Sequence, residues 1–308
     1  MRNAAVFLGL VALLVAVPGC GSDDDGDAGP IAFTATPPGG GDRRVYVVDP
    51  DGGPARQLPG IAGDSDPSWS PDGTRVALHR WAHAGCRRPH RDCAQIVVLN
   101  ADGTGAHAVT RPGHHSLAPD WSPDGRMLVF ARWQDDANPF ANSADIYVVD
   151  ADGTGLRLLT QGPGDDGSPA WSPDGSQIAF TSTRSGNYDL YVMRADGSGL
   201  RQLTHTGKPE YSPAWSPDGK RIAFQNGDGE LAVMNADGTD PHPLIHSSSG
   251  DGQPVWSPDG RRIAFLRHGP SGDSLYVMRD DGSDARRLEL GEIDQPSDPD
   301  WAVAPPAE

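Results

Sequence analysis

The stretch Trp69-Ser70-Pro71-Asp72-Gly73 decides the fold, because it returns along nearly the whole chain. Successive copies are 52, 50, 44, 41 and 45 residues apart, counted between their tryptophans. A period in this range is typical of repeat architectures, in which one small unit is stacked many times. The later copies begin at Trp121, Trp171, Trp215 and Trp256, and a sixth, degraded copy begins at Trp301, where Ala302-Val303 replaces Ser-Pro.

Each repeat has the pattern of four short β-strands. In the copy that begins at Trp171, the β-rich runs Ile178–Phe180, Leu190–Met193 and Arg201–Thr204 follow one another. The Ser-Pro-Asp-Gly segment predicts a tight turn after the first strand, and Asp196-Gly197 predicts another after the third. Because no sustained helical period of apolar residues follows residue 20, almost no helix is expected.

These units predict an all-β fold, a six-bladed β-propeller of four-stranded antiparallel blades around a central channel. The first three strands, which begin with Ile31–Thr34, lack a tryptophan strand, whereas the Trp301 strand has nothing after it. We therefore expect the C-terminal Trp301 strand to join the N-terminal blade and close the ring. The repeated tryptophans are assigned a structural role, with their rings packed between blades.

The first 30 residues predict export and a lipid anchor. Ala4–Val17 is an apolar run that follows Arg2, and it is too short to span a bilayer comfortably. Small residues before Cys20 resemble a lipoprotein cleavage site, although an ordinary signal peptide that contains a cysteine is the alternative. The predicted organisation is a signal peptide at 1–19, lipidation of Cys20, an acidic Gly/Asp tether at 20–30, the propeller at 31–303 and a tail at 304–308.

The two other cysteines, Cys86 and Cys93, are predicted to form a disulfide, because an exported protein meets an oxidising environment. A metal site that adds His83 and His90 is the rival interpretation, since the spacing alone permits it. We expect no metal and no cofactor.

The formal net charge of −17 argues against nucleic acid as a partner. An acidic, soluble surface is the simplest interpretation of this charge, and attraction of cations or of a basic partner is the functional one.

The repeat resembles that of the TolB-type propeller family. Trp-Ser-Pro-Asp-Gly, Ile-Ala-Phe, Leu-Tyr-Val-Met and Arg-Gln-Leu-Thr carry the resemblance, which covers roughly residues 31–303 and is best in Pro169–Thr204 and Pro213–Asp240. It implies a propeller in the cell envelope, and in the founding member the propeller binds a peptidoglycan-associated lipoprotein. This chain departs from that member by the expected lipid anchor and by having only a short tether where an α/β domain would stand. The resemblance transfers no catalytic residue.

Ligand-contacting residues are expected at the mouth of the channel with the longer loops, because loops carry function more often than strands. An arginine ring there would suit a carboxylate, a phosphate or an acidic peptide, unless the arginines are solvated or paired with Asp135, Asp136 or Asp189. His114 and His115, with His83, could hold a metal, although surface histidines without that role are the simpler interpretation. The predicted mouth residues are Arg80, Trp81, Arg132, Trp133, Arg184, Arg267, His114 and His115.

No Gly-x-Ser-x-Gly elbow, His-Glu-x-x-His motif or phosphate-binding loop occurs in the sequence. Asp150–Gly153 resembles part of a calcium loop, but the residues that follow supply no further acidic ligand, so a turn is predicted. The leading hypothesis is a monomeric, non-catalytic, membrane-anchored propeller that binds an envelope protein or peptide. The alternative is a carbohydrate-binding or carbohydrate-active propeller (a lyase or hydrolase), because exposed rings at Trp81 and Trp133 would stack on sugars.

Overall fold

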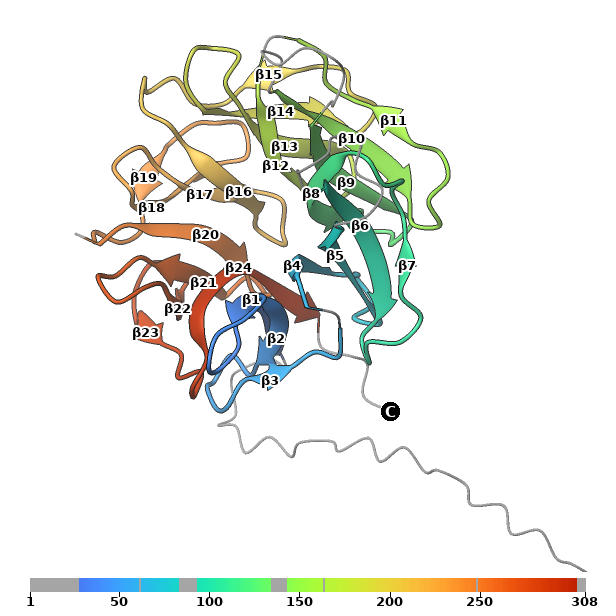
Figure 1. Ribbon diagram of the computed structural model, residues 1–308. Coiled ribbons are helices and arrows are strands. Elements are labelled where there is room, and N and C mark those ends of the chain that lie inside the picture. Colours follow the sequence, from blue (N-terminus) through green and yellow to red (C-terminus); the bar gives the residue numbers. More distant parts are fainter. Residues whose placement is uncertain are drawn as a thin grey trace, which may run out of the picture.

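The computed structural model describes residues 28–60, 62–82, 93–133, 143–162, 164–247 and 249–303. Over these residues the chain is all-β, with 24 strands arranged in a ring and no helix (Figure 1). Within the same residues there is no helix of the length and apolar character needed to cross a membrane. The signal peptide, Cys20 and the tail at 304–308 lie outside the described residues, so these assignments stay predictions.

Every unit uses the same order of strands from the channel outward. The innermost strands are β4 (Asp64–Trp69), β8 (His115–Trp121), β12 (Asp166–Trp171), β16 (Tyr211–Trp215), β20 (Asp251–Trp256) and β24 (Asp294–Val303). The second strands are β1 (Ala28–Thr36), β5 (Arg75–Ala82), β9 (Met127–Trp133), β13 (Gln177–Ser182), β17 (Arg221–Gln225) and β21 (Arg262–Arg267). The third strands are β2 (Arg44–Val48), β6 (Cys93–Asn100), β10 (Ala144–Asp150), β14 (Asp189–Arg194), β18 (Leu231–Asn235) and β22 (Ser274–Arg279). The short outer strands are β3 (Arg56–Gln57), β7 (His107–Ala108), β11 (Arg157–Leu158), β15 (Arg201–Gln202), β19 (His242–Pro243) and β23 (Arg286–Arg287).

The structure corrects the prediction of six separate four-stranded blades. Only four sheets have four strands each, namely β24-β1-β2-β3, β12 to β15, β16 to β19 and β20 to β23. Strands β4 to β11 instead form one eight-stranded sheet, whose halves β4 to β7 and β8 to β11 keep the strand order of the smaller sheets. The six-bladed count is therefore wrong: there are four blades of four strands and one sheet twice that size.

The joined sheet has a local cause in the length of β6. This strand has 8 residues, whereas β14, β18 and β22 at the same place in other units have 6, 5 and 6. The extra residues lie at its beginning, and there Ala94 pairs in parallel with His115 of β8. Strand β6 belongs to the longest repeat, in which 52 residues separate Trp69 from Trp121.

The Ser-Pro-Asp-Gly segment forms the predicted tight turn between the first and second strands. In the first copy the N–H of Gly73 donates to the Ser70 carbonyl at 2.8 Å, and Gly73 has a φ of 66°, which glycine adopts without steric cost. The Ser70 hydroxyl donates to Asp72 at 2.6 Å and accepts the N–H of Arg75 at 2.9 Å. The Ser70 hydroxyl is the largest cause that lowers the pKa of Asp72 to about 2, and hydrogen bonds from Thr74 add to the effect. The repeated segment is therefore scaffold.

The tryptophans pack between neighbouring units, as predicted. Trp121 is 4% exposed and lies in one apolar cluster with Ala77 and Ile96 of the preceding unit. Its indole N–H donates to the Ser68 carbonyl at 3.1 Å, and the guanidinium of Arg75 lies 4.4 Å from the ring centroid. Arginines cover Trp256 and Trp301 in the same way. Burial and cation–π contact together join adjacent sheets.

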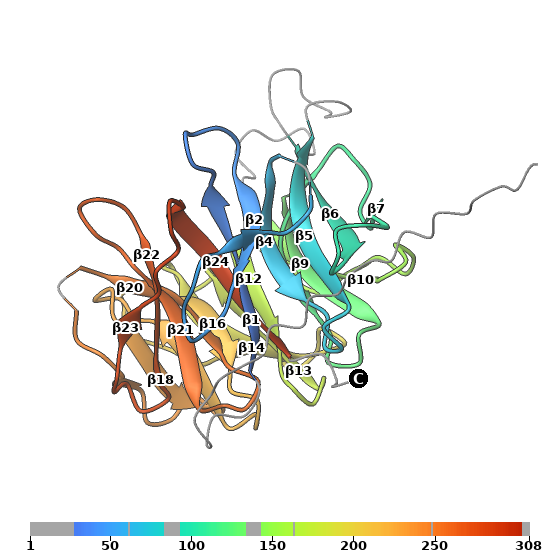
Figure 2. The ribbon, with the colours of Figure 1, turned by 90° about the horizontal axis from the view of Figure 1, so that it is seen from below.

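The ring closes where the sequence predicts it. Strand β24 pairs antiparallel with β1 (Figure 2). In this pairing Ile31 lies opposite Trp301. Trp301 is 5% exposed and packs with Ile31 and Phe33 in one cluster. Since β1 begins at Ala28, it starts slightly before the predicted end of the tether.

Replacing Trp301 with alanine should lower the free energy of unfolding by about 3–5 kcal/mol, because a large buried ring is lost at the closure. Chemical denaturation followed by far-ultraviolet circular dichroism measures this change. The matched control is Val303→Ala in the same strand, where the side chain is 43% exposed and about 0.5 kcal/mol or less is expected. Equal effects of the two substitutions would contradict the assigned closure.

Candidate binding site in the central channel

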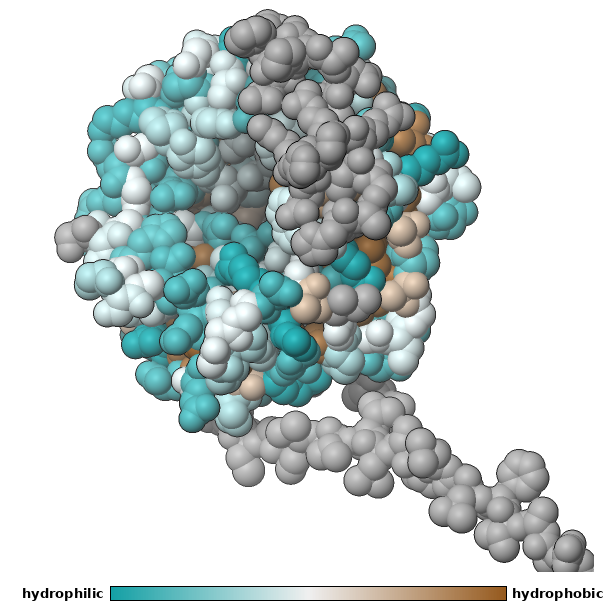
Figure 3. Space-filling view, viewed as in Figure 1, coloured by the Kyte–Doolittle hydropathy of each residue, from teal (hydrophilic) through white to brown (hydrophobic). Residues whose placement is uncertain are grey.

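The central channel holds a cavity with a volume of about 420 Å³. It is lined by the second halves of the innermost strands β4, β8, β12, β16, β20 and β24. Figure 3 shows the face of the molecule hollowed near the middle of the ring. A cavity of this size is in the range of small-ligand pockets and would also admit a side chain from a partner.

A proline stands two residues before each tryptophan, and the residue before that proline has a left-handed backbone. The register between the first and second strands shifts at this point in β4, β8, β12, β16 and β20, which marks a β-bulge. Such a backbone costs a non-glycine residue on the order of 1–2 kcal/mol. The φ angles are 51° for Asp66, 50° for Ala118, 46° for Ser168, 52° for Ser212, 50° for Gln253 and 51° for Asp298.

The residues before and after each proline line the channel, and their side chains differ between repeats. Aspartates stand at four of these places, on the three neighbouring strands β24, β4 and β8. Strands β12, β16 and β20 contribute Ser, Ala, Gln and Val instead. One half of the channel wall is therefore acidic and the other half neutral. The four aspartates are Asp66, Asp120, Asp298 and Asp300, and each is partly buried.

Asp66 and Asp298 are hydrogen-bonded to each other through their carboxyl groups. Asp66 Oδ2 lies 2.9 Å from Nδ1 of His79 and accepts the N–H of Ala118 at 3.3 Å. Asp298 exchanges two hydrogen bonds with Gln253, at 2.7 and 3.0 Å. Burial, reinforced by the neighbouring Asp66 charge, raises the pKa of Asp298 to about 7. Burial acts in the same direction on Asp66, but His79 outweighs it and lowers the pKa of Asp66 to about 2. The pair can hold and release one proton.

Asp120 and Asp300 occupy the equivalent place in β8 and β24, directly before a tryptophan. Each carboxylate accepts the backbone N–H of the tryptophan in the next unit, Trp171 at 2.7 Å and Trp69 at 2.6 Å. Burial raises the pKa of Asp120 to about 7, with the charge of Asp300 adding to the effect. Burial likewise raises the pKa of Asp300 to about 6. Three carboxyl groups of the channel therefore change charge near neutral pH.

Some buried donors beside the channel have no acceptor. The residues Trp171 and Trp301 line the cavity, but their indole N–H groups, like that of Trp69, are buried and without a hydrogen-bond partner. Trp215 and Trp256 also line it, but their indole N–H groups donate to Ala170 and Ala214 carbonyls at 3.2 and 3.1 Å.

Three of the four arginines of the predicted ring are held in structural ion pairs. Arg80 binds both carboxylate oxygens of Asp64, Arg184 binds both of Asp166, and Arg267 binds both of Asp251, at 2.6–2.9 Å. All three aspartates are at most 2% exposed. Their partners are the first residues of innermost strands and not Asp189, which begins β14. Asp135 and Asp136 lie outside the described residues. The aspartate carboxylates therefore already occupy the guanidinium N–H groups that would bind an anionic ligand.

Arg132 lies at the equivalent place in β9, where its strand partners are Ser116 of β8 and Asp145 of β10. Its guanidinium lies 5.3 Å from the centroid of the Tyr147 ring. The unit of β8 has Ser116 where the units of β4, β12 and β20 have the buried aspartate, so the arrangement of the other three arginines is not repeated here.

The predicted aromatic residues gather at one side of the long-loop mouth. Trp81 is 40% exposed, and its ring centroid lies 5.9 Å from that of His115 and 5.4 Å from that of His79. His115 is in turn the strand partner of the half-buried Trp133. His114 is partly buried beside them in sequence. The structure thus brings Trp81, His115 and Trp133 into one group.

The metal alternatives receive no support within the described residues. No three His, Cys, Asp or Glu side chains there are grouped so that they could hold a metal ion. His83, Cys86 and His90 lie outside the described part of the chain. Cys93 is disulfide-bonded, and its pairing with Cys86 stays a prediction. In the turn resembling a calcium loop, Asp152 accepts the N–H and hydroxyl of Thr154, as a plain turn requires.

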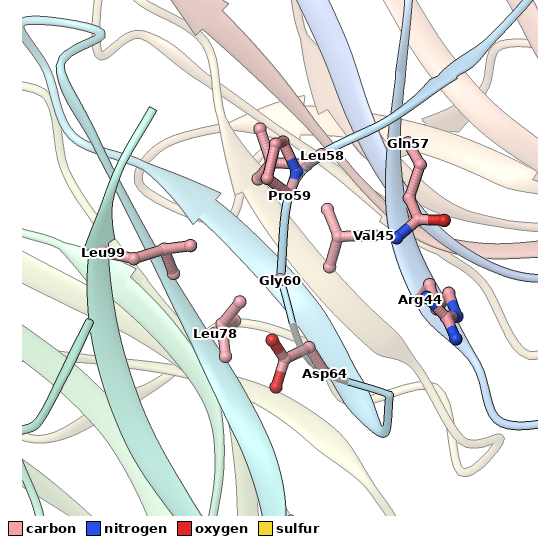
Figure 4. A pocket seen from close by; sticks show the side chains of 9 residues that line it. All are labelled: Arg44, Val45, Gln57, Leu58, Pro59, Gly60, Asp64, Leu78 and Leu99. Carbon is pink, nitrogen blue, oxygen red and sulfur yellow. The ribbon is translucent and has the colours of Figure 1, made fainter. Parts of the chain in front are cut away.

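A second cavity lies between β2 and β3 on one side and β5 and β6 on the other (Figure 4). Its volume is about 10 Å³, enough for one water at most. Leu58, Leu78 and Leu99 line it, and Asp64 stands at its edge beside Gly60. It is a packing defect between sheets and not a ligand site.

Comparison with known proteins identifies the family. Residues 88–304, more than half of the chain, match the family model described as the TolB beta propeller domain. The chain belongs to this family. No curated protein matches the sequence.

Solved structures of TolB proteins share the fold of this TolB-family propeller. TolB from Acinetobacter baumannii has a TM-score of 0.73 at 22% identity, with 89% of this chain and 66% of that chain covered. A putative TolB from Agrobacterium tumefaciens has a TM-score of 0.64 at 22% identity, with 86% and 90% covered. A structure described as a nidogen/laminin complex has a TM-score of 0.68 at 13% identity, with 90% and 99% covered. At these identities the likeness concerns the fold.

The channel aspartates are the residues that sequence reasoning missed. A signal for them exists, because the proline two residues before each tryptophan is present in all six copies. Aligning the copies on that proline places Asp66 with Asp298 and Asp120 with Asp300 as the variable, acidic positions. The expectation that the longer loops carry the ligand contacts favoured arginines instead, and three of these are held in ion pairs.

The TolB-family propeller should become less stable as the pH rises from 5 to 8. A carboxyl whose pKa is about 7 when folded and 3.8 when unfolded binds more protons in the folded state, so its stabilising effect is lost over this range. For Asp120 we expect a loss on the order of 1–2 kcal/mol, since water in the channel weakens the effect. Urea denaturation at each pH measures it.

Asp120→Asn should flatten this pH dependence, because the amide keeps an acceptor for the Trp171 N–H but cannot ionise. Asp102→Asn, at an exposed turn, is the control and should leave the slope unchanged. A slope in Asp120→Asn equal to that of the unmodified protein would contradict the raised pKa.

Proposed function

We propose that this chain is an exported, lipid-anchored, non-catalytic propeller that binds a protein or peptide partner in the cell envelope. Membership of the TolB β-propeller family carries the proposal, because the match spans the propeller repeats and TolB proteins share their fold. The sequence before the first strand supports export and anchoring through Cys20. The partner would meet the channel face, where the repeats differ most in side-chain chemistry.

Affinity capture from envelope extract tests the proposal. The bait is the chain with Cys20→Ser, folded and tagged at its C-terminus, and the control is the same bait after thermal unfolding. We expect at least one envelope protein to be enriched by the folded bait alone and to bind it again when both are purified. Failure of every enriched protein to bind the purified propeller would overturn the proposal. Before capture, fractionation should find the unmodified chain with membranes and Cys20→Ser in the soluble fraction.

A carbohydrate ligand is the second candidate, and the exposed Trp81 favours it. Its ring, with His115 and Trp133 nearby, offers a surface on which a sugar would stack. If this candidate is correct, a glycan array gives a signal that Trp81→Ala reduces at least tenfold. Leu200→Ala, which also removes an exposed apolar side chain, is the control. An array without signal, or one that Trp81→Ala leaves unchanged, eliminates the carbohydrate.

A further inference from the structure

One repeat tryptophan is covered less completely than the others. Trp215, at the end of β16, is half-buried, whereas the five other repeat tryptophans are at most 9% exposed. Its indole N–H donates to the Ala170 carbonyl at 3.2 Å, and those of Trp121 and Trp256 donate to the equivalent carbonyls of their preceding units. The ring of Trp215 is therefore anchored as theirs are, and the difference lies in the residue that covers it.

In three other places an arginine covers the tryptophan of the next unit. Each of these arginines is the first residue of a second strand, β5, β17 or β21. A guanidinium group over an indole ring is a favourable cation–π contact, and it is strongest where solvent is excluded. The pairs are Arg75 with Trp121, Arg221 with Trp256 and Arg262 with Trp301, at 4.4, 4.6 and 5.3 Å from guanidinium carbon to ring centroid.

The unit that precedes Trp215 has an uncharged residue at this place. Its second strand, β13, begins with Gln177 where β5, β17 and β21 begin with arginine. Strand β9 begins with Met127, which packs against the apolar cluster that contains Trp171. Arginine or methionine thus accompanies a buried tryptophan, and the shorter glutamine accompanies the half-buried one.

A third cavity, with a volume of about 280 Å³, lies where an arginine would cover Trp215. Gln177 and Trp215 line it together with turn residues of two adjacent units. It shares Trp215 and Pro217 with the channel, but its other lining residues do not belong to the channel wall, so it is a separate site between two turns. Its exposed lining residues leave it accessible to solvent. The turn residues are Ser172, Pro173, Asp174, Pro217, Asp218 and Gly219.

We propose that this cavity binds the guanidinium group of an arginine side chain from a partner, stacked on Trp215 in the place that the chain's own arginines fill in other units. The site goes beyond the partner binding proposed at the channel face, because it lies between the turns after β12 and β16. A planar guanidinium stacks on an aromatic face and donates hydrogen bonds from its edge at the same time, which a compact ammonium group does not do.

A backbone acceptor for the edge of the guanidinium lines the same cavity. While Arg75 covers Trp121, its guanidinium donates to the Gly125 carbonyl at 3.0 Å. Gly219 is the equivalent residue in the turn after Trp215, and it lines the cavity. A guanidinium over Trp215 therefore meets the same two partners, a ring and a turn carbonyl, that Arg75 meets one unit earlier.

Two carboxylates at the cavity favour a cation over a neutral group. The Ser172 hydroxyl is the largest cause that lowers the pKa of Asp174, and the Ser216 hydroxyl has this role for Asp218, so both stay ionised at neutral pH. Lys220 lies 3.7 Å from Asp218, but its side chain is 80% exposed, and an exposed ion pair of this kind competes weakly.

Titration with a matched pair of probes tests the inference. N-acetylarginine methylamide carries the guanidinium, and N-acetylcitrulline methylamide has nearly the same shape with an uncharged urea group. Each is added to the isotope-labelled full chain with Cys20→Ser, and the indole N–H resonance of Trp215, assigned by its loss in Trp215→Phe, reports binding. We expect a saturable shift with the arginine probe and at least fivefold weaker binding of the citrulline probe. Equal binding of the two probes, or no shift at Trp215, would overturn the proposal.

Filling the cavity with a side chain of the protein is the second test. Gln177→Arg reproduces the place of Arg75, so it should weaken binding of the arginine probe at least tenfold and raise the midpoint of thermal unfolding by about 2–4 °C. Gln177→Met reproduces Met127 and should weaken binding as much without adding charge. The charge-matched control is Thr74→Arg at an exposed turn, which should change binding less than twofold. Probe binding that survives both Gln177 variants would overturn the site.

Failure of this site and failure of the proposed function give different results. The probe titration needs no envelope protein, so a missing shift at Trp215 removes the guanidinium site and leaves partner capture to be judged by itself. A shift that depends on Gln177, with no envelope partner captured, supports the site and counts against the proposed function.

Discussion

Pairing of β24 with β1 is the contact on which the rest of the structure depends. Each sheet leaves its inner strand with one edge unpaired, and only the ring arrangement protects these edges and the flat faces between sheets. Because the last strand belongs to the first blade, the chain completes its final inter-sheet contacts only when both ends of the propeller meet. Trp301, between Ile31 and the neighbouring unit, makes that junction resemble the covalently continuous ones.

The repeat pattern predicted the strand order, the tight turns, the tryptophan packing and the closure, because these depend on residue types that recur in every copy. It did not predict that β4 to β11 join in one sheet, since this depends on where β6 begins and not on a motif. The sequence did not reveal the partners of Arg80 and Arg267, because these are first residues of innermost strands, which only the strand pairing brings opposite the arginines. The channel aspartates differ from the residues at the same positions in the other copies, so the shared repeat pattern does not predict them.

Scaffold and site are interleaved within each innermost strand. Pro67 removes a backbone donor from the edge that faces the channel, and Trp69 two residues later holds the unit against its neighbour. The chemistry of the residue after the proline varies from Ser68 to Asp120 to Val255 without loss of the strand. The acidic ones gather at the junction of first and last units, where sequence-distant strands meet.

The left-handed backbone before each proline also restricts which side chains can stand at that one position of the channel wall. A backbone near φ of 50° excludes β-branched residues and most bulky ones and is best tolerated by short or flexible polar residues. The six residues found there, Asp66, Ala118, Ser168, Ser212, Gln253 and Asp298, all obey this limit. The bulge thus limits the residue types that this position can accept. Relatives that keep the bulge can vary this position only among small and polar residues.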